Sequence, residues 1–199
     1  MSESFQKNQQ IILDYERKFA SELAVKVVEK PALTIWRIIM PLLLIYHAVK
    51  LKEYKQDISI FTQGVMKSKL LALGSAYNEL RSNLPSHDYL HSLEVGEDST
   101  TPNMKLFITR QKAEVELIKS HYKKLLKSSG TDYESLLRNV YKNRGQYRNY
   151  LLKLEKTEQD IQDSILKIHH PGSVAREMSL SMQLALKEMR KEEIKRVFG

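Results

Sequence analysis

The side chains best suited to bind a metal lie in the stretch HDYLHSLE, residues 87 to 94. His87, His91 and Glu94 are spaced by four and three residues, so on a helix they share one face. Imidazole and carboxylate groups placed in this way are typical zinc ligands. The sequence assures no further ligand, because it contains neither a Glu-x-x-His pair nor any Cys. We therefore expect no metal and no other cofactor, and a metal-binding bundle is a rival hypothesis.

A second polar set lies in DYESLLRNVYKNRGQYRNYLLKLEK, residues 132 to 156, where tyrosines and arginines interleave. Such residues suit base stacking and phosphate contact, so an RNA-binding bundle is another rival hypothesis. At about 100° per residue along one helix, however, Arg144 projects close to the direction of Leu137 and Leu151. We therefore predict that Arg144 is partly buried and has a carboxylate or carbonyl partner. The polar residues assigned to the bundle are Arg138, Tyr141, Arg144, Tyr147 and Arg148, of which the RNA-binding rival would use the three arginines.

No set of residues typical of an enzyme can be identified. The sequence has no recognisable paired carboxylates, no Ser-His-Asp combination and no glycine-rich loop that would cradle a phosphate. The lack of Cys removes thiolate catalysis and disulfides, and it is compatible with a reducing compartment. We therefore expect a protein that is not an enzyme.

The elements that must position these side chains are helices. Only 7 Gly and 5 Pro occur in 199 residues, and residues that favour helices dominate the remainder. Apolar residues recur every three to four positions. This spacing predicts helices at about 5 to 29, from 31 to about 80 with a kink or break near Pro41, Gly64 or Gly74, at 104 to 127, at 132 to 168, and from Ser173 onward. The fold class is all-α.

The connections between the later helices are short, so we expect these helices to pack as antiparallel neighbours. The clearest loop is EVGEDSTTPN, residues 94 to 103, which is rich in turn-forming residues. We predict an antiparallel helical bundle with an N-terminal amphipathic arm and one apolar helical segment. In this division, residues 1 to 60 form the arm plus the apolar segment at 32 to 49, and residues 61 to 199 form a basic helical bundle.

The apolar segment has 18 residues, which is the lower limit for a helix that spans a bilayer. Trp36 and Tyr46 are ten residues apart, or about 15 Å along a helix, so they fit one membrane interface better than two. A wide apolar arc beside a narrow polar seam suits a helix in a membrane and a helix in a bundle core equally well. The residues assigned to membrane anchoring are Trp36, Arg37, Ile38, Ile39, Pro41, Leu42, Leu43, Leu44, Ile45 and Tyr46.

The formal net charge is +8, which suits an acidic partner such as anionic lipid. The charges nevertheless alternate in sign along the chain, as in KEMRKEEIKR, and this pattern is typical of a solvated helix face. The first residues, MSESFQKNQQIILDYERKF, contain no continuous apolar run, so no secretory signal is expected there.

Three stretches together suggest a family: KPALTIWRIIMPLLLIYHAVK, YESLLRNVYKNRGQYRNYLLKLEKTEQD and the terminal MRKEEIKRVF. In these the chain resembles an uncharacterised family of small bacterial helical proteins with an N-terminal apolar W-x-x-I-x-P segment. The resemblance covers most of the chain and implies a similar helical fold. It implies no activity and no site residues.

These observations favour a non-enzymatic, membrane-associated helical adaptor or scaffold, anchored by residues 32 to 49. We expect it at the cytoplasmic face of the inner membrane, with membrane lipid and an unidentified protein as partners, and without nucleic acid. The alternative is a soluble, cytoplasmic module for protein-protein interaction. In that case residues 32 to 49 would lie in the core or in the interface of a homo-oligomer.

Overall fold

The computed structural model describes residues 2–28, 41–84, 101–168 and 173–199, and within these ranges every regular element is a helix. The predicted all-α fold is therefore confirmed. The helices are α1 (Ser2–Val27), α3 (Pro41–Ser82), α5 (Pro102–Leu126), α6 (Tyr133–Tyr141), α7 (Arg144–Ile168) and α8 (Ser173–Phe198).

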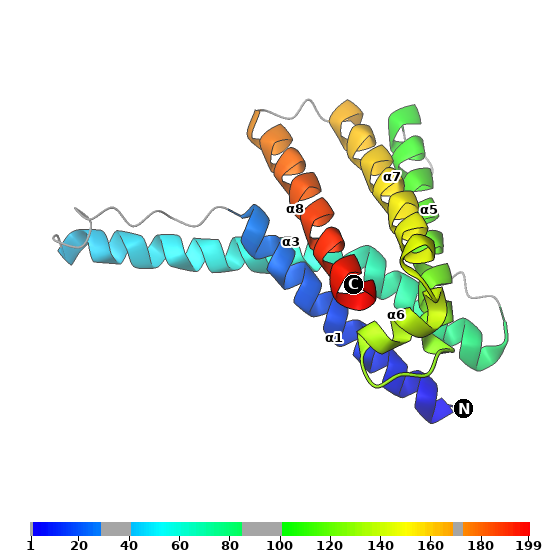
Figure 1. Cartoon of the computed structure of the whole chain (residues 1–199). Coiled ribbons are helices and arrows are strands. Elements are labelled where there is room, and N and C mark those ends of the chain that lie inside the picture. The colour runs from blue at the N-terminus through cyan, green and yellow to red at the C-terminus, as the bar shows by residue number, and fades with distance from the viewer. Residues whose placement is uncertain (1, 29–40, 85–100, 169–172) are drawn as a thin grey trace.

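The helices form a bundle in which α5, α7 and α8 stand side by side with alternating direction (Figure 1). This arrangement confirms that the later helices are antiparallel neighbours. The short helix α6 lies at the end where α5 finishes and α7 begins, and α3 runs across the bundle against both α1 and α5. Residues distant in the sequence are thus brought together at the centre.

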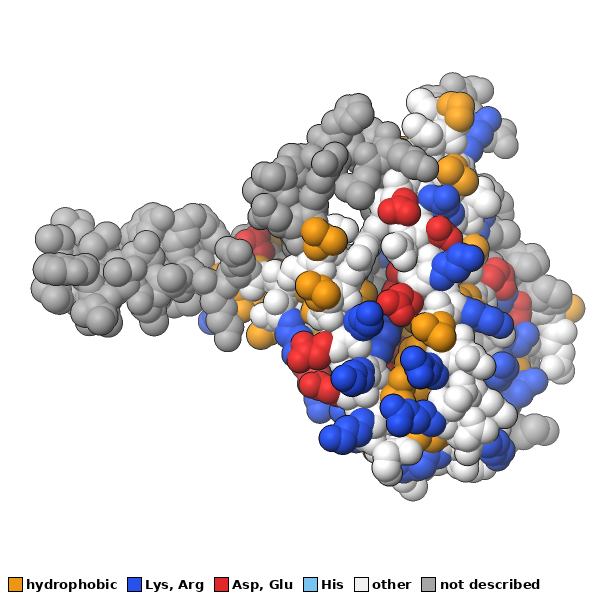
Figure 2. Space-filling view, turned by 45° about the horizontal axis from the view of Figure 1, so that its top comes forward, with side chains coloured by type: hydrophobic (Ala, Val, Ile, Leu, Met, Phe, Trp, Pro, Cys, Tyr) orange, Lys and Arg blue, Asp and Glu red, His pale blue; other side chains and the backbone are white. Residues whose placement is uncertain are grey.

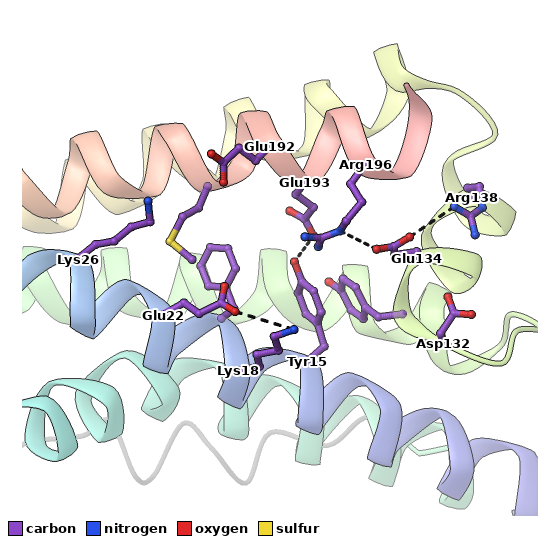
Figure 3. Close-up of a pocket in the computed structure, with 13 residues that line it drawn as sticks. Tyr15, Lys18, Glu22, Lys26, Asp132, Glu134, Arg138, Glu192, Glu193 and Arg196 are labelled. Atoms are coloured by element: carbon purple, nitrogen blue, oxygen red, sulfur yellow. Dashed lines mark hydrogen bonds and ion pairs between the residues drawn. The ribbon is translucent and has the colours of Figure 1, made fainter.

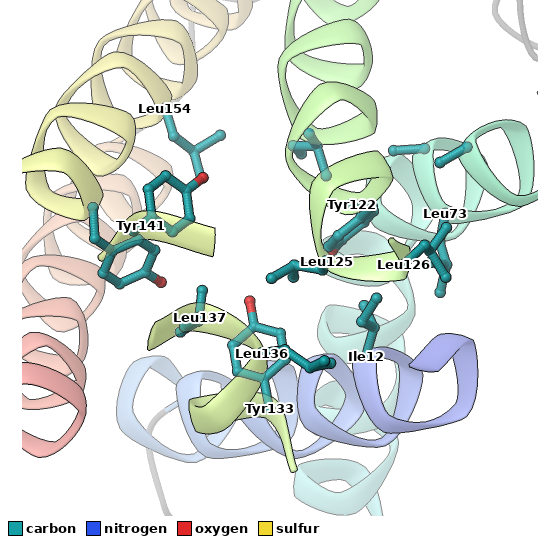
Figure 4. Close-up of a cluster of buried hydrophobic side chains, with 14 of the residues drawn as sticks. Ile12, Leu73, Tyr122, Leu125, Leu126, Tyr133, Leu136, Leu137, Tyr141 and Leu154 are labelled. Carbon is teal, nitrogen blue, oxygen red and sulfur yellow. The ribbon is translucent and has the colours of Figure 1, made fainter. Parts of the chain in front are cut away.

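The larger core cluster joins α1, α3, α5, α6, α7 and α8 (Figure 4). Its most deeply buried members are aliphatic and aromatic side chains that the predicted stripes place inward. They include Ile12, Ala72, Val115, Tyr122, Leu125, Leu136, Leu137 and Tyr147. Burying each large apolar side chain contributes roughly 1.5 to 3 kcal/mol to stability, so this cluster holds these helices together.

A second cluster shows that α1 is not an arm separate from the bundle. Phe19, Leu23 and Val27 of α1 pack against Ala185, Leu186 and Met189 of α8. Together with Ile12, which is fully buried in the larger cluster, they place the whole apolar stripe of α1 inside the bundle. The expected boundary at residue 60 also falls within α3, which is continuous there. Residues on both sides of that boundary therefore share one core.

Helix α3 has 42 residues, so it is about 63 Å long at about 1.5 Å per residue. It begins at Pro41, which suits the first turn because a proline has no backbone N–H to leave unpaired. The helix then continues without interruption through Gly64 and Gly74, where breaks were considered. Its side chains are described from Tyr54 onward, and among these the members of the two core clusters lie from Phe61 onward. Its earlier part extends beyond the other helices (Figure 1).

The single helix predicted from 132 to 168 is in fact two helices, and this prediction was wrong. Lys142 adopts a φ of 58°, which no α-helix accommodates, and it separates α6 from α7. Asn143 then starts α7 by accepting a hydrogen bond from the backbone N–H of Gln146 at 3.0 Å. At the other end of α6, Asp132 forms the capping box with Ser135.

The predicted loop at 94 to 103 extends two residues too far. Pro102 is the first residue of α5, and the Thr101 side chain accepts a hydrogen bond from the backbone N–H of Met104. Asn103 therefore lies in the first helical turn. Residues 94 to 100 lie outside the described residues.

Candidate functional site

The predicted sites fall partly outside the described residues. This applies to the metal candidates His87, His91 and Glu94, and to Trp36, Arg37, Ile38 and Ile39 of the apolar segment. The remaining anchoring residues, Pro41, Leu42, Leu43, Leu44, Ile45 and Tyr46, form the start of α3, but their side chains are not among those described. Within the described ranges, no group of three or more His, Cys, Asp or Glu side chains is placed to hold a metal ion.

The five polar residues assigned to the bundle divide into two groups. Tyr141 and Tyr147 are buried, as expected for Tyr147 from its apolar stripe. Arg138, Arg144 and Arg148 are exposed. The predicted burial of Arg144 is wrong because the break at Lys142 interrupts the helix over which the direction of its side chain was extrapolated.

A groove lies between α1, α6 and α8, with a volume of about 460 Å³ (Figure 3). Tyr15 and Tyr133 stack in its floor, with ring centroids 3.6 Å apart and planes 6° apart. Phe19 and Met189 also line it. Such a floor suits the apolar anchor of another molecule, since aromatic and methionine side chains dominate the centres of interfaces.

The rim of this groove carries both signs of charge, and ion pairs within the chain link several of its members. Arg196 lies 2.6 Å from Glu134, and Arg138 lies 3.8 Å from the same carboxylate. Lys18 lies 3.9 Å from Glu22. The groove therefore has no surplus of unpaired cations with which to attract a simple anion. Its apolar floor and mixed charges fit a partner protein whose surface presents apolar and charged side chains together.

Beneath the groove, the carboxylate of Glu16 organises a buried polar network. The Tyr122 hydroxyl donates to it at 2.8 Å, and the Lys69 ammonium forms an ion pair with its other oxygen. The three residues come from α1, α5 and α3, respectively. Glu16 itself is 7% exposed, so its charge depends on these partners for compensation.

A second buried carboxylate, Glu193 of α8, accepts hydrogen bonds from Tyr15, at 2.5 Å, and from Tyr147. Burial raises the pKa of Glu193, although the two tyrosines oppose this rise. Nearby, Arg190 forms a two-pronged pair with Glu158 at 2.6 and 2.8 Å. Glu16 and Glu193 both line a small pocket of about 40 Å³. This space admits water but not an organic substrate.

His121 is buried beside three tyrosines. Its Nδ1 lies 2.7 Å from the Tyr141 hydroxyl, its Nε2 lies 3.3 Å from the Tyr133 hydroxyl, and its ring stacks on Tyr150 with centroids 4.2 Å apart. Burial lowers the pKa of His121 to about 3, with a further contribution from the positive charge of Lys124. The imidazole is therefore neutral in the folded protein at physiological pH, and it acts there as a packed aromatic ring and hydrogen-bonding group.

We expect the neutral state of His121 to make the protein sensitive to acid. The unfolded chain takes up a proton on this group near pH 6.5, whereas the folded chain takes it up only near pH 3. The unfolded state therefore binds more protons between these values. The free energy of unfolding should accordingly fall as the pH falls from about 6.5, by at most about 1.4 kcal/mol per pH unit.

Urea denaturation of wild type and His121→Phe between pH 7 and pH 5 measures this contribution. The variant should have a lower free energy of unfolding than wild type at pH 7. Its free energy of unfolding should also fall less steeply between pH 7 and pH 5. Tyr141→Phe is the matched control, since it removes the 2.7 Å hydrogen bond while retaining the imidazole, and it should keep the slope. Raised carboxyl pKa values, as at Glu193, act in the opposite direction in all three proteins. Equal slopes for wild type and His121→Phe would contradict the buried neutral imidazole.

On the face of the bundle shown in Figure 2, lysine and arginine side chains are interspersed with aspartate and glutamate, and apolar side chains appear in small groups. This distribution agrees with the alternating charges of the sequence. In the described part of the chain, no helix combines the length and the apolar character required to cross a membrane.

The buried carboxylates were not identified from the sequence, although a signal for them exists. Glu16 follows Ile12 by four residues and precedes Phe19 by three, and so it stands within the apolar stripe of α1. Glu193 stands in the same way between Met189 and Val197 of α8. A carboxylate in register with an apolar stripe indicates a buried charge. The sequence cannot indicate which side chain compensates it.

The chain matches no family model, and neither the curated proteins nor the solved structures contain a detectable relative.

Proposed function

We propose that the protein is a non-enzymatic helical adaptor that docks on a membrane through the apolar segment at residues 32 to 49 and binds a protein partner with its bundle. The observation that carries this proposal is the course of α3. This helix begins in the middle of the apolar segment, and its first part extends beyond the bundle rather than through its centre (Figure 1).

The packed part of α3 supports this reading. Among the α3 side chains that are described, from Tyr54 onward, those in the two core clusters are found at Phe61 and beyond, including Val65, Ala72 and Leu73. The apolar run PLLLIY lies about 15 to 20 residues earlier in the same helix, or roughly 20 to 30 Å away. An apolar run at that distance from the core requires another apolar environment, because leaving it in water forfeits roughly 25 cal/mol for each Å².

A shallow position in the membrane fits the segment better than a span. Pro41 opens α3 and lies midway between Trp36 and Tyr46 in the sequence. The two aromatic residues are suited to one headgroup region, where amphipathic rings are favoured. Lys50 and Lys52 follow directly and are suited to the phosphates of the cytoplasmic leaflet.

The groove between α1, α6 and α8 is the surface we assign to the protein partner. Its stacked tyrosines would receive an apolar anchor, and its mixed charges would orient the partner. The groove is formed by residues of α1, α6 and α8. The start of α3 extends away from these helices (Figure 1), so a membrane and a partner would be contacted together.

Flotation with lipid vesicles tests the proposal. The purified full chain, mixed with vesicles that contain about one fifth anionic lipid, should float with them, and a large fraction should stay bound in 0.5 M salt because the contact is mainly apolar. Release by salt would indicate an electrostatic contact with the basic surface instead. A chain that remains with the soluble fraction in both conditions would favour the rival soluble interaction module.

A further inference from the structure

The first half of α8 has more apolar faces than the bundle covers. Its sequence SVAREMSLSMQLAL, residues 173 to 186, contains two charged residues, whereas the following twelve residues, KEMRKEEIKRVF, contain eight. Ala185, Leu186 and Met189 pack against α1 in the second core cluster. Leu180 and Leu184 project elsewhere and are 60% and 69% exposed. A helix that is apolar on opposite faces is normally covered on both, so these two leucines indicate a further contact.

Charges of opposite sign flank the two leucines along the helix. Glu177, Leu180, Leu184 and Lys187 are spaced by three, four and three residues, so their positions form one row on α8. Lys187 is exposed, like the leucines. The row extends over ten residues, or about 15 Å. It reads the same from either end, except that the charge changes sign.

The contacts of α8 with its neighbours leave this row open. Gln183 faces α7, where its side chain donates to that of Gln162. Glu188 faces α1, where it lies 3.4 Å from Lys26. At about 100° per residue, the row falls between these two flanks and away from the core. It contributes no residue to the groove between α1, α6 and α8.

The symmetry of the row fits a second copy of α8 that lies antiparallel to the first. A two-fold axis beside the midpoint of the row would bring Leu180 of each copy against Leu184 of the other. The same axis would place Glu177 of each copy beside Lys187 of the other, so an ion pair would close each end of the apolar contact. A parallel pair would instead bring like charges together at both ends, which is unfavourable.

From this pattern we infer that the outer face of α8 is a surface at which two copies of the chain form an antiparallel dimer. The contact is small, so the dissociation constant is expected in the micromolar range that is typical of transient complexes. The surface is separate from the apolar segment at residues 32 to 49. The inference therefore does not depend on the proposed function.

Sedimentation velocity of the full chain at about 0.1 M salt, over a range of micromolar concentrations, tests the inference. Wild type should show a monomer–dimer equilibrium. Lys187→Glu should weaken the dimer by about tenfold or more, because both ion pairs become contacts between like charges. Adding Glu177→Lys to that variant restores opposite charges at both ends. The dissociation constant should then return to within about threefold of the wild-type value.

Two control variants locate the contact. Lys156→Glu makes the same charge change at an exposed position of α7 and should leave the dissociation constant within about twofold. Leu184→Ser should abolish the dimer without changing the circular dichroism or the melting temperature, because this leucine lies mostly in solvent.

A wild-type chain that stays monomeric at every concentration would overturn the inference. If Leu184→Ser then also loses binding to vesicles, the leucine belongs to a membrane contact instead. A dimer that Lys187→Glu leaves unchanged would overturn the inference as well, since a parallel pair or another face of the molecule would then make the contact.

Discussion

Replacing both Leu43 and Ile45 by Lys is expected to move the protein from the membrane fraction to the soluble fraction. A lysine at mid-depth in a bilayer costs roughly 2.5 to 3.5 kcal/mol, and less near the interface, where its side chain reaches the headgroups. The free-energy cost of two such charges exceeds the small net gain from inserting an 18-residue segment into the bilayer. The bundle should stay folded by circular dichroism, because the described α3 members of its core lie at Phe61 and beyond.

Leu180→Lys with Leu184→Lys is the matched control. These leucines are 60% and 69% exposed on α8, so the change adds the same charge at apolar positions within the bundle. This control variant should remain with the membrane. If the change at Leu43 and Ile45 instead unfolds or aggregates the protein, the apolar segment is a buried core element. If that variant still floats with vesicles, the segment is not the anchor.

Replacing Glu16 by Ala is expected to lower the free energy of unfolding by about 3 to 5 kcal/mol. The change leaves the Lys69 ammonium and the Tyr122 hydroxyl without their buried acceptor, and breaking a buried pair from one side carries a cost of that size. For a chain of this length the melting temperature should fall by about 6 to 20 °C. Thermal and urea denaturation measure both quantities.

Two further variants separate the buried charge from the loss of a side chain. Glu22→Ala removes a carboxylate from the same helix, but its pair with Lys18 is exposed and 3.9 Å long, so stability should change by less than about 1 kcal/mol. Glu16→Leu with Lys69→Met removes both charges and should recover much of the stability lost in Glu16→Ala. Similar losses for Glu16→Ala and Glu22→Ala would contradict a buried network.

Much of the fold could be predicted because the helices of this chain are long and their apolar stripes regular. The stripe of α1 gives Ile12, Phe19, Leu23 and Val27, all of which are buried. The end of a helix can be predicted where a capping residue stands next to it in the sequence, as Asp132 does before α6. The break at Lys142 was not, because a lysine carries no signal for a positive φ, and tertiary packing of α6 against α8 and α5 selects it.

The surface sites were harder to predict than the fold. The polar stretch from 132 to 156 contributes Tyr141, Gln146, Asn149, Tyr150 and Lys153 to a hollow of about 430 Å³ against α5. The sequence singled out the arginines as the residues that an RNA-binding bundle would use. The structure instead lines this hollow with tyrosines, amides and lysines, and α5 supplies Lys124 and His121.

The sequence by itself determined the helical class, the stripes that face inward, the apolar segment and the mixture of charges on the surface, since each of these follows from residue type and from a periodicity of about 3.6. Tertiary structure alone decided which buried charges meet. Glu16 of α1 reaches Lys69 of α3 and Tyr122 of α5, and Glu193 of α8 reaches Tyr15 of α1. These partners are 53, 106 and 178 residues apart in the sequence. No local pattern encodes a contact at that separation, because it depends on how whole helices cross.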